Sequence, residues 1–146
     1  MARYLVLAHQ TARSPELAAK LKEIAAGDAD AEFVLIVPAT PINHRLTWEE
    51  GESNVVARRI AEATRDELQQ AGLRVTRADI GDPSPVSSID DELLARPDDY
   101  KAIVISTLPP GISRWLKLDL VHRATRRYQL TVFHVVAESA PAPATA

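Results

Sequence analysis

The sequence contains no cysteine, which excludes disulfide bonds, thiolate metal ligands and cysteine nucleophiles. It also has no apolar run approaching the roughly 20 residues that a membrane-spanning helix needs. The first apolar stretch, YLVLA at Tyr4 to Ala8, is too short for the apolar region of a signal peptide. We therefore expect a cytoplasmic protein with no membrane as a partner.

The chain also lacks a large net charge of either sign. The net charge of −3 offers no overall attraction to nucleic acid or to an anionic membrane surface, so neither is expected as a partner. The histidines never fall at a metal-ligand spacing such as H-x3-H, and the sequence has no G-x-S-x-G nucleophile elbow. These absences disfavour a metal site and a serine hydrolase, and we expect a protein that is not an enzyme.

The chain does contain short apolar runs that alternate with amphipathic helical patterns. Strands are expected at Tyr4 to Ala8, Phe33 to Val37, Leu73 to Ile80 (a wetter edge strand), Ala102 to Ser106 and Thr131 to Val136. Helices are expected from Ser14-Pro15 to Gly27, from Ser53 or Asn54 to Gly72, around Val86 to Leu94, and from Ser113 to Arg127. Right-handed crossovers of such elements make an α/β three-layer sandwich with five parallel strands and four helices.

Two segments do not fit this alternation. Ala39 to Glu52 is the longest irregular stretch, and it is either a surface excursion pinned by Trp48 or a lid or partner-binding segment. The tail AESAPAPATA is low in complexity and poor in apolar residues, so we expect one domain over residues 1–137 and a disordered tail over 138–146.

The first place to look for a ligand is the turn Thr107 to Ser113. Ligands of open parallel sheets bind beyond the carboxyl ends of strands, and this turn and His9 both follow such ends. Gln10 and Thr11 add polar groups there, and Arg114 adds a cation at the start of the next helix. The candidate ligand-binding residues are His9, Gln10, Thr107, Gly111, Ser113 and Arg114. Alternatively, Ser113 merely caps that helix while Arg114 is solvated.

The stretch IGDPSPVSSIDDEL, followed by VIS, a turn, a helix and VFHVV, resembles the universal stress protein family. The resemblance covers nearly all of Arg3 to Ala137. It implies a Rossmann-like, adenine-nucleotide alpha-hydrolase-like fold with a parallel sheet of order 3-2-1-4-5. It also implies a stress-response type of binding or regulatory protein, usually a homodimer through the last strand.

Members of that family that bind ATP carry G-x2-G-x9-G-[ST] after the fourth strand and an aspartate at the end of the first. In this chain the four motif positions are Ser106, Pro109, Asp119 and Leu120, and His9 stands where the aspartate would be. A register anchored on Gly111 does no better, since Leu108, Val121 and His122 take the other positions. We therefore expect no cofactor and no ATP binding in the family manner. The alternative is a nucleotide- or anion-binding protein with a phosphate loop rebuilt around Gly111 and weak ATPase activity.

The last strand, TVFHVV at Thr131 to Val136, is almost wholly apolar and has no charged residue until Glu138. An apolar edge strand invites pairing with another chain unless it is covered. We therefore expect a homodimer through this strand, with His134 buried in the core or in the interface. The alternative is a monomer whose tail folds back over the edge.

Overall fold

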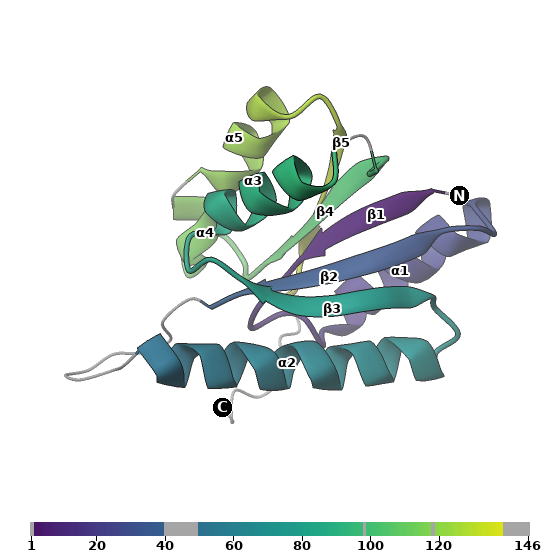
Figure 1. Ribbon diagram of the computed structural model, residues 1–146, viewed down its shortest axis with the longest axis horizontal. Coiled ribbons are helices and arrows are strands. Elements are labelled where there is room, and N and C mark those ends of the chain that lie inside the picture. Colours follow the sequence, from purple (N-terminus) through teal and green to yellow (C-terminus); the bar gives the residue numbers. More distant parts are fainter. Residues whose placement is uncertain (1, 40–49, 98, 118, 139–146) are drawn as a thin grey trace.

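The computed structural model describes residues 2–39, 50–97, 99–117 and 119–138 (Figure 1). Its five strands all run parallel, in the order β3-β2-β1-β4-β5. They are β1 (Arg3–Leu7), β2 (Glu32–Pro38), β3 (Val75–Gly81), β4 (Ala102–Thr107) and β5 (Thr131–Val136). The sheet order expected from the family resemblance is therefore confirmed, and β3 is an edge strand as its alternating pattern predicted.

Helices cover both faces of the sheet and complete the three layers (Figure 1). They are α1 (Pro15–Gly27), α2 (Glu50–Gln70), α3 (Pro85–Ala95), α4 (Arg114–Lys117) and α5 (Leu120–Arg127). Apolar residues of α1 and α2 pack on one face, and those of α3, α4 and α5 pack on the other. Over the described ranges, no helix combines the length and the apolar character needed to cross a membrane.

The central strands owe their continuous apolar runs to this arrangement, because both of their faces are covered. On β1, for example, Val6 belongs to the core beneath α1 and α2, whereas Leu7 belongs to the core beneath α3 and α5. Local signals fix where the helices begin. Ser14 Oγ accepts a hydrogen bond from the Leu17 amide at 3.1 Å and precedes Pro15, which confirms the predicted N-cap of α1.

Two predicted helix boundaries were wrong. The second helix begins at Glu50, so Ser53 and Asn54 lie inside α2 instead of capping it. The predicted helix from Ser113 to Arg127 is divided into α4 and α5. Asp119 interrupts it with φ of 59°, in the left-handed region that aspartate tolerates better than most residues.

The remaining predictions for irregular segments fall mostly outside the described residues. They concern the predicted lid or surface excursion from Ala39 to Glu52, of which 50–52 belong to α2 and 40–49 are not described, and the predicted disorder of 138–146, of which 139–146 are not described. Both stay predictions.

Candidate functional site

The carboxyl ends of β1 and β4 lie side by side in the sheet, since Leu7 is paired with Ile105. The loop that follows β1 therefore reaches the residues that end β4. The side-chain oxygens of Thr11 and Ser106 lie 2.5 Å apart, and both side chains are buried. Thr11, which the sequence indicated only as a polar neighbour of His9, thus joins the two strand ends, whereas Gln10 is exposed.

His9 is buried, with 7% of its surface exposed, at the end of β1. Its Nε2 atom has no hydrogen-bond partner among the described residues. Burial lowers the pKa of His9 to about 4, because desolvation disfavours the charged imidazolium. At neutral pH the ring is therefore uncharged. Its Nε2 can form one hydrogen bond with a ligand, but the ring cannot neutralise the negative charge of a phosphate.

The turn formed by residues 107–113 has most of its backbone donors occupied or missing. The Pro109 carbonyl accepts hydrogen bonds from the amides of Ile112, at 3.2 Å, and Ser113, at 3.1 Å. Pro109 and Pro110 have no amide hydrogen to donate. Gly111 adopts φ of 98°, which lets the chain turn back so that these bonds can form.

Ser113 acts as a helix cap, since its Oγ accepts a hydrogen bond from the Leu116 amide at 3.1 Å and the residue is buried. This contact confirms the cap interpretation of Ser113 and leaves its oxygen engaged with the helix. Arg114 is the first residue of α4, but its side chain is outside the described part of the structure. The role predicted for Arg114 therefore stays a prediction.

Thr107 points toward the last strand. Its Oγ1 atom lies 2.9 Å from Nε2 of His134, and only 2% of the residue is exposed. The Thr107 hydroxyl thus joins β4 to β5. Of the two predicted positions for His134, the core is wrong, because within the chain it is an exposed residue; the position in a dimer interface stays a prediction.

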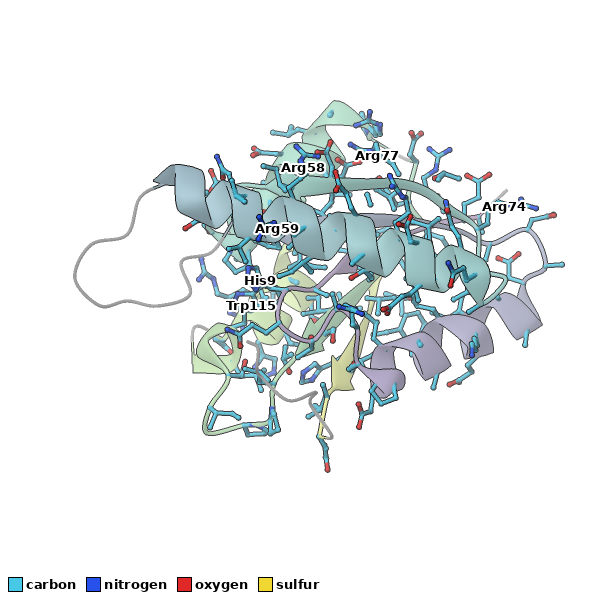
Figure 2. All side chains as sticks on the ribbon, turned by 90° about the horizontal axis from the view of Figure 1, so that it is seen from below. His9, Arg58, Arg59, Arg74, Arg77 and Trp115 are labelled. Atoms are coloured by element: carbon cyan, nitrogen blue, oxygen red, sulfur yellow. The ribbon has the colours of Figure 1, made fainter. Side chains whose placement is uncertain are left out.

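Trp115, in the first turn of α4, is a residue that the sequence analysis did not select. It is 7% exposed and belongs to the same buried cluster as Leu7, the last residue of β1, and Ile105 of β4. Figure 2 shows His9 and Trp115 at the same end of the molecule, near the first half of α2. The sequence did offer a signal for Trp115, since a large aromatic residue shortly after the candidate turn can pack against the strands beside it.

This edge of the sheet also carries exposed apolar residues. Ile112, in the turn, is 64% exposed, and Val55, near the start of α2, is 51% exposed. Across the described residues, no group of three or more histidine, aspartate or glutamate side chains could hold a metal ion. The described part of the site thus combines hydroxyls, a neutral imidazole and apolar surface.

A separate polar pocket of about 460 Å³ opens at the opposite, amino-terminal edge of the sheet. Its lining residues are Ala2, Arg3, Asp28, Asp30, Asp99, Tyr100 and Lys101. The charges in it compensate one another: Arg3 lies 3.2 Å from Asp99, and Lys101 lies 3.9 Å from Asp28. These ion pairs join the segments that lead into β1, β2 and β4.

No family model matches the sequence, and no curated protein matches it. Solved structures do. A universal stress protein from Archaeoglobus fulgidus is 15% identical, with a TM-score of 0.60 over 92% of this chain and 93% of that chain. A universal stress protein family protein from Arabidopsis thaliana with AMP bound is 11% identical, with a TM-score of 0.60 over 95% of this chain and 94% of that one.

A universal stress protein in complex with cAMP is 14% identical, with a TM-score of 0.57 over 94% of this chain and 98% of that chain. Because these structures align with nearly the whole chain, the predicted resemblance is confirmed at the level of the fold. The chain has the fold of the universal stress proteins.

Proposed function

We propose that this chain is a cytoplasmic, non-catalytic binding protein of the universal stress type, with regulatory function, that does not hold the phosphates of ATP. The 107–113 turn carries this proposal. A phosphate loop works by aiming free backbone amides at the phosphates, in front of a helix N-terminus. In this turn the amides of Ile112 and Ser113 are bonded to Pro109 instead, and two prolines remove two more donors.

The helix that follows the turn, α4, does little to compensate for these missing donors. α4 contains four residues and is separated from α5 by the left-handed Asp119. A helix dipole is the sum of aligned peptide dipoles, so a single short turn supplies a weaker positive end than a continuous helix. His9 contributes no positive charge, because burial keeps its imidazole neutral at physiological pH.

A nucleotide-binding protein with a rebuilt loop is the second candidate. One neighbouring structure holds AMP and another holds cAMP, and both cover almost all of this chain. The buried Nε2 of His9, unpartnered within the described chain, favours some polar ligand group at the end of β1. A nucleoside or monophosphate would need fewer phosphate contacts than ATP, so this candidate and the absence of ATP binding are compatible.

Calorimetry with ATP, AMP, cAMP and inorganic phosphate tests the proposal. We expect ATP to bind no more tightly than about 1 mM, which is roughly 4 kcal/mol of binding free energy. Micromolar ATP binding, or ATP retained through purification, would overturn the proposal. If AMP or cAMP binds, His9→Ala should weaken it, whereas His122→Ala, at an exposed position on α5, should not.

We also propose that the chain forms a homodimer through β5. The two edges of the sheet differ in how they are protected. β3 carries charges: Asp79 pairs with Arg58 at 3.2 Å and with Arg77 at 3.5 Å, and Arg77 also pairs with Glu92. Figure 2 shows Arg58 and Arg77 near this edge. Charged side chains of this kind prevent further strand pairing.

β5 has no fixed charge. Its sequence TVFHVV places Phe133 and Val135 in the core beneath α1, and Val132 packs on the α5 side. A cation does lie against its core-side face: Nζ of Lys20 is 4.7 Å from the centre of the Phe133 ring. An edge without fixed charge is self-complementary, because twofold pairing brings no like charges together. A second copy of β5 is therefore the partner that suits this edge.

A further inference from the structure

His134 is the one ionisable residue of β5. It lies in an otherwise uncharged edge strand, is exposed, and has Nε2 2.9 Å from the Thr107 hydroxyl. Side chains alternate along a strand, so His134 lies on the same side as Val132, toward α5. The residue thus occupies the edge that we propose for dimerisation.

The elements packed against β5 place several charges around His134. β4, whose sequence is AIVIST, contributes no ionisable side chain. On α5, His122 pairs with Asp119 at 3.3 Å, and Arg127 pairs with Asp90 at 2.9 Å. The other basic residues of α5 are Arg123 and Arg126, and α1, on the opposite face, contributes Glu16, Lys20, Lys22 and Glu23. The contact made directly by the His134 ring is the neutral one with Thr107.

Symmetry brings two copies of this histidine together. The centre of Thr131–Val136 falls between Phe133 and His134. Twofold antiparallel pairing places one residue directly opposite its own copy, and His134 is one of the two residues at this centre. In the register that pairs His134 with its copy, the two Cβ atoms lie roughly 4.5–5.5 Å apart on the same face of the sheet. Two neutral imidazoles at that distance are compatible with burial, whereas two imidazolium ions repel each other and lose solvation.

We propose that His134 makes the β5 dimer pH-sensitive, so that the chain is dimeric at neutral pH and dissociates as this residue is protonated. This inference rests on the homodimer of the proposed function. Partial desolvation already lowers the pKa of His134 within a single chain, and a partner strand would bury the ring further. A lowered pKa means that the dimer is favoured above the ordinary histidine pKa and is lost as the pH falls below it.

Sedimentation equilibrium at constant ionic strength tests this inference. Between pH 8.0 and pH 5.5 we expect the dimer dissociation constant to rise at least about tenfold. His134→Gln keeps a neutral side chain able to bond Thr107, so its dissociation constant should be nearly the same at both pH values. His122→Gln serves as the matched control, since His122 is an exposed α5 residue with its own partner, and its pH response should equal that of the wild type.

The possible results separate the two proposals. A dimer with equal dissociation constants at both pH values would overturn the role of His134 and leave the homodimer standing. A pH response that persists in His134→Gln would do the same. A monomer at both pH values would overturn the homodimer and this inference with it. Circular dichroism at pH 5.5 confirms that any dissociated chain is still folded.

Discussion

Thr11 and Ser106 lie 95 positions apart in the sequence, yet their side-chain oxygens are 2.5 Å apart. The contact joins the loop after β1 to the end of β4, and both residues are almost completely buried. It fixes the shape of the carboxyl edge beside His9. The candidate site is therefore held in place by a pair of hydroxyls that are not themselves adjacent in the chain.

Removing one of these hydroxyls should destabilise the protein, because the other is left buried without a partner. We expect Thr11→Val and Ser106→Ala each to lower the free energy of unfolding by about 1–3 kcal/mol. The double variant should lose less unfolding free energy than the two single variants together, with a coupling energy of about 1 kcal/mol between the two sites. Urea denaturation measures all four proteins, and Thr76→Val, at an exposed position on β3, serves as the control. Strictly additive losses would contradict the proposed coupling.

His9 should make folding sensitive to mild acid. Its pKa in the folded protein is about 4, against an ordinary value of 6.5, so the unfolded chain binds more protons between these pH values. Stability is therefore fully present above about pH 6.5 and falls as the pH is lowered toward 4. Lowering the pH from 7.5 to 5 should reduce the free energy of unfolding by about 2 kcal/mol through His9 alone.

The His9 contribution can be isolated by comparing the wild type with His9→Gln in urea denaturation at the two pH values. The difference in unfolding free energy between them should narrow by about 2 kcal/mol on acidification. A difference that does not change with pH would show that His9 is not buried in its neutral form.

Gly81, the last residue of β3, has no room for a side chain. A Cβ atom there would lie 2.5 Å from Oγ of Ser88 and 2.8 Å from Cγ2 of Ile36. Gly81→Ala should therefore lower the free energy of unfolding by about 1–3 kcal/mol, through strain between β3, α3 and β2. Gly27→Ala, where nothing lies within 4 Å, is the matched control and should be neutral or slightly stabilising. Equal stability of both variants would disprove the close packing at Gly81.

The dimer proposal predicts that one charge on the free edge of β5 will produce monomers. Thr131 is exposed, so Thr131→Lys should leave the fold intact while placing a lysine where two copies meet. Light scattering at micromolar concentration should then report half of the wild-type mass. Val132→Asp should act in the same way. Val135→Asp is a poorer choice, because Val135 is 8% exposed and its loss would disturb the core.

The matched control for the edge variants is Thr76→Lys, at an exposed position on the opposite edge strand, β3. It should leave the mass unchanged. A wild-type protein that is already monomeric would refute the proposed assembly outright.

Much of the fold was predictable from the sequence because the signals are local. Four apolar runs predicted four of the strands, since a strand covered on both faces needs a continuous apolar sequence, and an alternating pattern predicted the edge strand β3. Ser14-Pro15 predicted the start of α1 because a hydroxyl cap and a proline at the first helical position act within one turn. The prolines at 109 and 110 likewise showed that two backbone donors are missing, whatever the tertiary structure.

Other features were decided only by the tertiary structure. Periodicity favoured one helix through Asp119, but the backbone there is left-handed and divides it. The apolar sequence around His134 left the core and a dimer interface as alternatives, and the structure excludes the core by exposing the residue at the edge of the sheet. The neutrality of His9 and the contact between Thr11 and Ser106 depend on which distant segments surround them. Strand patterns are set by neighbours in sequence, whereas burial, pKa and side-chain partners are set by neighbours in space.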